Sequence, residues 1–215
     1  MKFGLLVLSS VIATSRAFML NNRISMARNI GRSFCTAGDE TTADDAPKGE
    51  FTELSRLEIR VGKIVEIDTH PEADTLFVEK VDVGEEDGPR TIVSGLVEYC
   101  NKEDLLNRDV IVLCNLKPRA LKGITSAGML LCASNKEDSK VDPLTPPAGS
   151  EIGDLITFEG HTSEFIAPGN RASKAFSKIA DDLSTNAAGE ATYKGIPFMT
   201  NAGACTSVIK DGNIS

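Results

Sequence analysis

Residues 115–135, which read NLKPRALKGITSAGMLLCASN, constrain the fold of this chain more than any other stretch. An apolar run at residues 110–114 leads into this stretch, and a second apolar run at residues 129–132 leaves it. Between the two runs, Pro118 and Gly123 interrupt regular structure. The sequence therefore predicts two strands joined by a loop.

The predicted loop carries positive charge only. Its charged residues are Lys117, Arg119 and Lys122. A basic loop between two strands makes a surface suited to the phosphate backbone of a nucleic acid. Ser126 and Met129 follow where the second strand begins, so a hydroxyl group and a soft apolar side chain lie beside the cations. The alternative is an ordinary hairpin with a solvated, lysine-rich connection, and the loop by itself does not distinguish the two.

The charge of the whole chain opposes a nonspecific nucleic-acid role. Residues 1–38 hold five basic residues and no acidic one, so the remainder holds 18 basic residues (23 minus 5) and all 31 acidic ones, a net charge of -13. Long-range repulsion of a polyanion acts before any local contact forms. Binding of nucleic acid must therefore rest on a local patch of cations.

The residues that usually carry catalysis or bind metals form no recognisable pattern. The cysteines are five in number and widely spaced, and the two histidines are isolated. No C-x-x-C pair, glycine-rich nucleotide loop or nucleophile elbow is present. We therefore expect no metal site, no cofactor and no enzymatic activity. Unpaired cysteines within apolar runs are typical of a protein from a reducing compartment.

The first 50 residues read as targeting and linker sequence. Residues 1–17 combine a lysine, an apolar stretch and small residues, as in a signal peptide, and residues 18–38 are rich in arginine and hydroxyl residues and lack acids, as in a transit peptide. This pattern resembles the two-part presequences of plastids acquired by secondary endosymbiosis, and we expect plastid import. Secretion, a mitochondrial presequence and a cytoplasmic protein are the alternatives. Residues 39–50 are acidic and polar and predict a linker.

From residue 51 the pattern is that of a mainly β protein. Apolar residues alternate with polar ones in three further runs, at residues 57–67, 76–83 and 90–95, and Gly62 predicts a bend or bulge in the first of them. A short helix is expected at residues 99–106, capped by Asn101. Five strands with one short helix between the third and fourth is the order of an OB-fold barrel.

A turn-rich, proline-containing segment separates this barrel, residues 51–145, from a C-terminal extension, residues 146–215. We expect the extension to be a small α+β structure packed on the barrel. Its expected elements are a strand at residues 155–158, a helix at 172–183, and short strands around 193–198 and at 208–209.

Several short motifs of the barrel resemble one family. They are RVGKI at 60–64, HPEAD at 70–74, VDVG at 81–84, VSGL at 93–96, NLKP at 115–118 and SAGM at 126–129. With the matches PAGS at 147–150 and ATYKGIPF at 191–198, the chain from about residue 57 resembles the tRNA-binding module of endothelial monocyte-activating polypeptide, the C-terminal part of p43. Similar modules are attached to some tyrosyl- and methionyl-tRNA synthetases.

The resemblance implies structure-specific binding of the outer corner of tRNA, without reading of the anticodon, by an auxiliary factor of aminoacyl-tRNA synthetases. The residues that it assigns to the site are Lys117, Arg119, Lys122, Ser126, Met129, Asn115, Ser94, Arg60 and Lys63. The three loop cations would meet phosphates, and Ser126 and Met129 would touch the sugar and base surface. Asn115 and Ser94 would shape the loop rather than bind.

Some of these assignments have a second interpretation. Met129 could pack in the core, and Lys63 could be a solvated strand residue. Either Arg60 or Lys63 could extend the basic face from the first strand. The acidic character of the chain departs from the basic character of the family, which implies modest affinity and a role as a helper docked to a synthetase.

The resemblance also implies a monomer, because the extension stands where the short bacterial tRNA-binding proteins and the CsaA-type chaperone place a second subunit. We expect no membrane association of the mature form. The functional alternatives are a secreted signalling factor of the same family, a peptide-binding chaperone, and a barrel for single-stranded nucleic acid or oligosaccharide. The low aromatic content, with no Trp, argues against single strands, which are usually bound by base stacking.

Overall fold

The structure, a computed structural model, describes residues 49–137 and 139–215. The predicted signal-like segment (1–17), the transit-like segment (18–38) and nearly all of the predicted linker (39–50) lie outside the described residues, so these assignments and plastid import stay predictions. Among the residues that the structure describes, no helix has both the length and the apolar character needed to cross a membrane.

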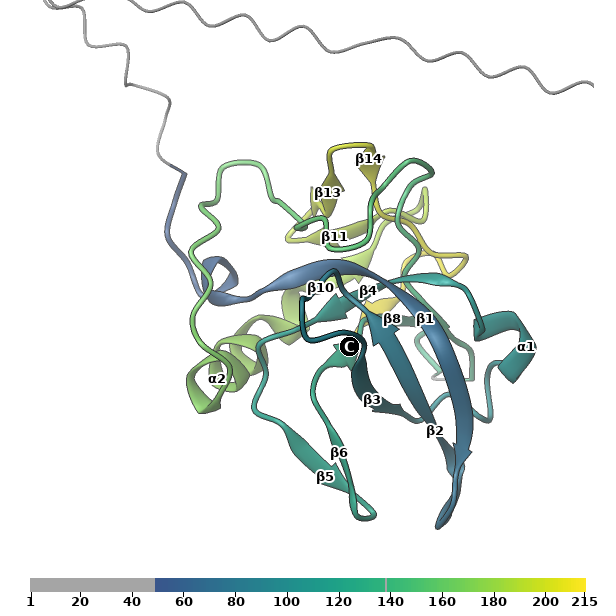
Figure 1. Cartoon of the computed structure of the whole chain (residues 1–215). Helices are drawn as coiled ribbons and strands as arrows, with labels where there is room; N and C mark the ends of the chain where they lie inside the picture. Colours follow the sequence, from purple (N-terminus) through teal and green to yellow (C-terminus); the bar gives the residue numbers. More distant parts are fainter. Residues whose placement is uncertain (1–48, 138) are drawn as a thin grey trace, which may run out of the picture. The chain divides into compact units, whose positions relative to one another are not determined.

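The first part of the described chain forms a five-stranded antiparallel sheet that curls into a barrel (Figure 1). In spatial order its strands are β3 (Arg90–Ser94), β2 (Ala73–Asp82), β1 (Ile59–His70), β4 (Asp109–Leu113) and β7 (Met129–Leu130). A short 3-10 helix, η1 (Leu54–Arg56), precedes β1, and helix α1 (Lys102–Leu105) connects β3 to β4. The predicted five strands with one helix between the third and fourth are confirmed.

Strand β1 is the longest strand of this sheet and lies at its centre, between β2 and β4. It pairs with β4 over residues 59–63 and with β2 from Lys63 onward. The irregularity expected at Gly62 lies instead between Ile64 and Glu66, where the register with β2 shifts. Gly62 has another reason to be glycine: a Cβ there would lie 3.0 Å from the side chains of Val81 and Val112. A bulge prediction from glycine alone misses such a close approach.

Strand β4 explains why the run before the basic loop is apolar without interruption. Val110 and Val112 belong to a hydrophobic cluster inside the barrel, whereas Ile111 and Leu113 belong to a second cluster that includes the C-terminal segment. Alternate residues of a strand point to opposite faces of a sheet, so β4 is buried on both faces. The apolar run is continuous in the sequence because neither face of β4 meets water.

The C-terminal part of the chain builds a second sheet onto the barrel. Its spatial order is β12 (Ile196–Pro197), β11 (Ala191–Tyr193), β10 (Leu183–Thr185), β15 (Asn213–Ile214), β8 (Cys132–Ser134) and β9 (Val141–Pro143). Strands β13 (Met199–Thr200) and β14 (Gly203–Ala204) form a separate two-stranded hairpin. The apolar run at residues 129–132 thus passes from the first sheet into the second. The α+β extension packed on the barrel is confirmed, and the domain boundary at residue 146 stays a prediction.

Two of the elements expected in the extension are wrong, and one is displaced. Residues 155–158 make only isolated bridges, and residues 208–209 form no strand, with Val208 79% exposed and Ile209 buried. A strand that the sequence analysis did not predict, β15, follows at residues 213–214, where Ile214 is buried. Helix α2 (Asn170–Ile179) starts two residues before the expected helix and ends in the 3-10 turn η2 (Ala180–Asp182).

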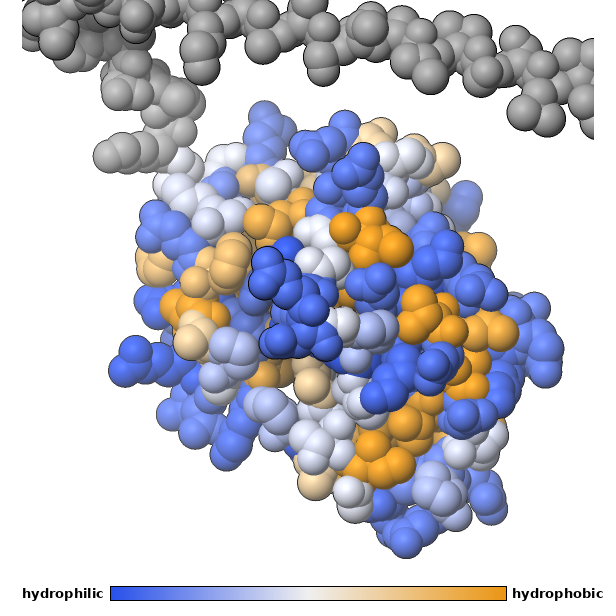
Figure 2. All heavy atoms as spheres, viewed as in Figure 1, coloured by the Kyte–Doolittle hydropathy of each residue, from blue (hydrophilic) through white to orange (hydrophobic). Residues whose placement is uncertain are grey.

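Apolar residues are scattered among hydrophilic ones over the face of the molecule seen in Figure 2.

Candidate nucleic-acid interface

The basic loop folds into a hairpin of its own. Strands β5 (Arg119–Leu121) and β6 (Ile124–Ser126) pair, joined by Lys122 and Gly123, whose φ angles are 47° and 87°. Two consecutive positive φ angles are typical of a type I′ turn, which matches the twist of a tight hairpin. We call residues 117–126 the cationic hairpin. The sequence analysis missed its strands, because residues 119–121 contain no β-branched or aromatic side chain and Lys122-Gly123 is not one of the Asn-Gly or Asp-Gly pairs that mark such a turn.

The three cations of the hairpin are exposed and available to a ligand. Lys117 precedes β5, Arg119 begins it, and Lys122 stands at the tip. Among the ion pairs of residues 49–137 and 139–215, none involves any of the three. No carboxylate competes with a phosphate group for an exposed cation that has no ion-pair partner. The hairpin is therefore a local positive surface on an acidic protein.

Asn115 fixes the start of the loop. Its side chain is fully buried, and its Oδ1 accepts a hydrogen bond from the Glu58 N–H at 3.0 Å. Its Nδ2 donates to the carbonyls of Arg56 at 2.8 Å and Ile166 at 2.9 Å. The amide thus joins the chain before β1, the start of the loop and the segment before α2. This geometry accords with the expectation that Asn115 shapes the loop, and leaves no part of the amide for a ligand.

Arg90 and Ser126 fix the end of the loop. Nη1 of Arg90 donates to the carbonyls of Cys114 and Ala127, one on each side of the loop. Its ion pair with Glu85 raises the pKa of Arg90 and lowers the pKa of Glu85. The buried Ser126 hydroxyl donates to the Gly128 carbonyl at 3.0 Å and accepts from the Val93 N–H at 3.0 Å.

These contacts change the role assigned to Ser126 and add Arg90, which the sequence analysis did not assign to the site. Ser126 was expected to touch RNA, but its only hydroxyl proton is used within the chain, so the geometry gives it a holding role and leaves its contact with RNA a prediction. Arg90 was missed because the two loop carbonyls that it contacts are 24 and 37 residues away in the sequence.

His70 holds the hairpin from the opposite side. Its ring is buried, its Nδ1 accepts from the Glu72 N–H at 3.0 Å, and its Nε2 lies 3.2 Å from the Leu121 carbonyl. Because Nδ1 is the acceptor, Nε2 carries the proton and donates to Leu121. His70 therefore connects the turn between β1 and β2 to the last residue of β5. The sequence analysis named this histidine only as part of the motif at residues 70–74 and gave it no contact with the loop.

Three further residues assigned to the site, Ser94, Arg60 and Lys63, contact other groups of the chain. Ser94 donates its hydroxyl proton to Oε1 of Glu79 at 2.7 Å, and burial raises the pKa of Glu79 to about 7. Nε of Arg60 lies 2.7 Å from Glu58, and Nη1 of Arg60 donates to the Gly153 carbonyl at 3.3 Å. Nζ of Lys63 lies 3.6 Å from Asp109. Arg60 and Lys63 are thus paired with carboxylates, unlike the hairpin cations, and their part in binding stays a prediction.

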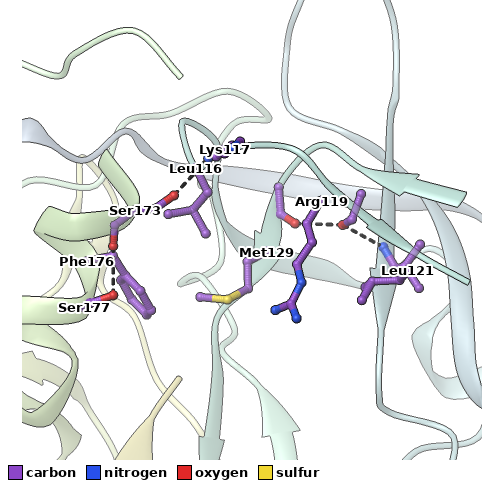
Figure 3. A pocket seen from close by; sticks show the side chains of 11 residues that line it. Leu116, Lys117, Arg119, Leu121, Met129, Ser173, Phe176 and Ser177 are labelled. Atoms are coloured by element: carbon purple, nitrogen blue, oxygen red, sulfur yellow. Dashed lines mark hydrogen bonds between the residues drawn. The ribbon is translucent and has the colours of Figure 1, made fainter. Parts of the chain in front are cut away.

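A cavity of about 320 Å³ separates the hairpin from helix α2 (Figure 3). We call it the hairpin–helix pocket. Its side chains come from the hairpin region, from β7 and from α2, and those labelled in Figure 3 are Leu116, Lys117, Arg119, Leu121, Met129, Ser173, Phe176 and Ser177. Met129 is partly buried and packs on the second hydrophobic cluster while it faces the pocket, so it has both of the roles considered for it.

Helix α2 is the part of this surface that sequence reasoning missed. The Lys117 N–H donates to the Ser173 hydroxyl at 3.1 Å, which ties the hairpin to the helix. Lys174 is exposed on the same helix, three residues before Ser177, and residues at that spacing are neighbours on a helix surface. The amphipathic pattern predicted the helix but contained nothing about which segment it would face.

The described residues contain no group of three or more His, Cys, Asp or Glu side chains that could hold a metal ion. Cys100, Cys114, Cys132 and Cys205 are free, and burial raises the pKa of each of their thiols. The candidate site consists of the exposed cations of the hairpin and the pocket beside them.

Comparison with known proteins finds relatives across both sheets. A family model of tRNA binding domains matches residues 59–155. The crystal structure of the C-terminal domain of p43 from Plasmodium vivax is 36% identical, with a TM-score of 0.68, over 75% of this chain and 98% of that domain. The match to a whole domain of p43 includes the region that contains α2 and the second sheet.

Two curated relatives are longer proteins. The aminoacyl tRNA synthase complex-interacting multifunctional protein 1 of Mus musculus is 48% identical over 154 residues, which are 71% of this chain and 49% of that protein. The cytoplasmic methionine–tRNA ligase of Arabidopsis thaliana is 45% identical over 178 residues, which are 82% of this chain and 22% of that enzyme. The chain thus spans less than half the length of either relative.

Proposed function

The chain belongs to the tRNA binding domain family in its p43 form, and from this premise we propose that it binds tRNA by shape, as a non-catalytic auxiliary factor of an aminoacyl-tRNA synthetase. The observation that carries the proposal is the cationic hairpin. Its three cations are exposed and unpaired within the described chain, and they lie inside the segment that matches the family.

The tethers of the hairpin support recognition by shape. Asn115, Arg90 and His70 fix its start, its end and its first strand through hydrogen bonds to backbone groups. A folded RNA is recognised through the spacing of its phosphates and hydroxyl groups, which requires cations at fixed positions. Cations on a loose loop would attract any polyanion equally, so a braced hairpin favours one RNA shape over others.

The acidic remainder of the chain sets the expected strength of binding. A net charge of -13 over residues 39–215 repels RNA at long range, and only a few phosphate contacts oppose it. We therefore propose modest affinity by itself, raised when the protein is docked to a synthetase that holds the same tRNA. The relatives that are parts of synthetases or of synthetase complexes support this second step.

The test is a gel shift of the purified chain with bulk tRNA at several salt concentrations. Lys117→Ala combined with Lys122→Ala should weaken binding of all tRNA species and lower the slope of log K against log salt by about 1.4 to 1.8, which corresponds to two phosphate contacts. Equal affinity and an unchanged slope would exclude the hairpin as the site.

A matched control removes the same charge from another surface. Lys140 and Lys210 are exposed; Lys140 lines a different pocket, next to Ile209, and Lys210 follows Ile209 in the chain. Lys140→Ala combined with Lys210→Ala should leave the salt slope close to that of the unmodified chain. If the control lowers the slope as much as the hairpin variant, binding depends on net charge alone.

We also propose that the protein is a monomer. Strand β8 pairs with β9 on one side and with β15 of the same chain on the other, so neither edge of β8 is open to a second copy. Light scattering after size-exclusion chromatography should give the mass of one chain, 22.9 kDa, or less if the N-terminus is removed. A mass of twice this value would contradict the proposal.

A further inference from the structure

The hairpin–helix pocket has apolar walls under a cationic rim. Met129, Phe176 and Leu116 are partly buried and pack on the hydrophobic cluster shared by the barrel and the C-terminal segment. Arg119 and Lys117 also line the pocket, and no acidic residue does. In Figure 3 the thioether of Met129 points toward the ring of Phe176, and the guanidinium of Arg119 lies on the other side of Met129.

Resting on the proposed function, we propose that this pocket receives one unpaired nucleobase of the bound RNA, which stacks against Phe176 while Lys117 and Arg119 contact the phosphates beside it. An unstacked base has two apolar faces and is joined to anionic phosphates on both sides. The pocket offers the complementary arrangement, an aromatic ring and a polarisable thioether within and cations outside. RNA that is paired throughout keeps its bases stacked and cannot fill it.

The volume and the construction of the pocket agree with this occupant. At about 320 Å³ the cavity is at the lower end of the range for ligand pockets, roughly 300–1,000 Å³. Its two walls belong to separate segments, and the hydrogen bond from the Lys117 N–H to the Ser173 hydroxyl sets their spacing. The C-terminal segment would then contribute to RNA binding directly, through Phe176, in addition to packing on the barrel.

The charge of the rim favours a nucleotide over an apolar peptide. Both occupants could bury apolar groups against Met129 and Phe176. Only the nucleotide carries a negative charge next to the buried group, where it would meet Lys117 and Arg119. An apolar peptide would leave both cations without a partner, so we assign the pocket to the nucleotide.

The first experiment uses the absence of tryptophan from the chain. Phe176→Trp places a single indole in the pocket, and a nucleobase stacked on it should quench its fluorescence. Saturating bulk tRNA should quench this signal, and a perfectly paired RNA duplex of similar length should leave it nearly unchanged. Val208→Trp is the matched control, because Val208 is 79% exposed and lines another pocket; its fluorescence should respond little to either RNA.

The second experiment measures affinity by gel shift. Stacking of one base on an aromatic side chain stabilises a complex by about 1–3 kcal/mol, so Phe176→Ala should weaken tRNA binding roughly 5- to 150-fold. Binding of the duplex should change less than 3-fold, as should binding of tRNA by Phe165→Ala, which removes an exposed ring outside the pocket.

The outcomes separate this proposal from the one on which it rests. If tRNA binds and the lysine substitutions weaken it, but Phe176→Trp is not quenched or is quenched equally by the duplex, the hairpin is the RNA site and the pocket holds no base. If no tRNA shift occurs at low salt, both proposals fail. Quenching by a chemically unfolded protein, but not by tRNA, would assign the pocket to peptides and overturn the nucleotide assignment.

Discussion

The five-stranded sheet and the cationic hairpin are both antiparallel β structure, but they are held in different ways. In the sheet, β4 is buried on both faces between two hydrophobic clusters. In the hairpin, Arg119, Ala120, Lys122 and Thr125 are exposed, and no hydrophobic cluster lies within it. Its position depends instead on hydrogen bonds from residues of other segments.

The difference follows from what each part must do. A cation that is to meet a phosphate cannot be buried or paired, so the segment that carries it cannot be stabilised by its own core. Discrete polar contacts replace the core and fix the cations without neutralising them. Substitutions should therefore divide into three classes: those in the sheet change stability, those of the hairpin cations change binding, and those of the contacts between them change both.

The largest effect is expected at Asn115, where the two regions meet. Asn115→Ala leaves the Glu58 N–H and the carbonyls of Arg56 and Ile166 without their partner. A buried polar group that loses its hydrogen bond costs about 1–3 kcal/mol, so the free energy of unfolding should fall by roughly 3–5 kcal/mol. Urea denaturation followed by circular dichroism measures this change. Asn135→Ala, at a half-buried asparagine of a surface turn, is the control and should change it by less than 1 kcal/mol.

The second largest effect is the pH dependence of stability caused by Glu79, which lies in the barrel. Glu79 is fully buried, its Oε2 has no hydrogen-bond partner, and burial raises its pKa to about 7, from an ordinary value of 4.5. Between these two values the folded state holds a proton that the unfolded state has lost, so stability decreases as pH rises. The contribution is fully present below pH 4.5 and lost above pH 7, an effect of about 3 kcal/mol.

Glu79→Gln cannot titrate, so the decrease in stability between pH 5 and pH 8 should be smaller by that amount in the variant than in the unmodified chain. Denaturation midpoints at several pH values give the two slopes. Parallel slopes would show that Glu79 is ionised in the folded barrel. tRNA affinity at pH 7 should not change, because Glu79 lies within the sheet and not in the hairpin–helix pocket.

The comparison of the sheet with the hairpin also explains how much of the structure could be predicted from the sequence. Alternating or continuous apolar runs predicted the strands of the barrel, because burial leaves a pattern in the sequence. The helix between the third and fourth strands was predicted from the segment that follows Asn101, a residue typical of a helix cap. The cations were found as well, since charge is visible directly. The contacts of Arg90 and His70 with the loop were missed, because a polar side chain bonded to a distant carbonyl has no periodicity. For the same reason the helix at residues 170–179 was expected, but Phe176 opposite Met129 was not.

A smaller effect is expected at His70, which belongs to the sheet but acts on the hairpin. His70→Ala removes the hydrogen bonds to the Leu121 carbonyl and from the Glu72 N–H. We expect a loss of about 1–2 kcal/mol in unfolding free energy. Because the hairpin then moves relative to the barrel, tRNA affinity should fall while the salt slope stays the same, since the cations remain. A lower slope would show that His70 itself contacts phosphate.

The smallest effect, and the strictest test of the division, is expected at Lys63. Its Nζ lies 3.6 Å from Asp109, and the side chains of Lys63 and Asp109 are 36% and 54% exposed. An exposed ion pair contributes about 0–1 kcal/mol, so Lys63→Ala should leave stability nearly unchanged. Since its charge is already paired, the salt slope for tRNA should also stay unchanged, whereas Lys117→Ala, which removes the same charge from the hairpin, should lower it by about 0.7 to 0.9. If Lys63→Ala lowers the slope equally, the RNA surface extends onto β1, and exposure without a carboxylate partner is not what distinguishes the binding cations from the others.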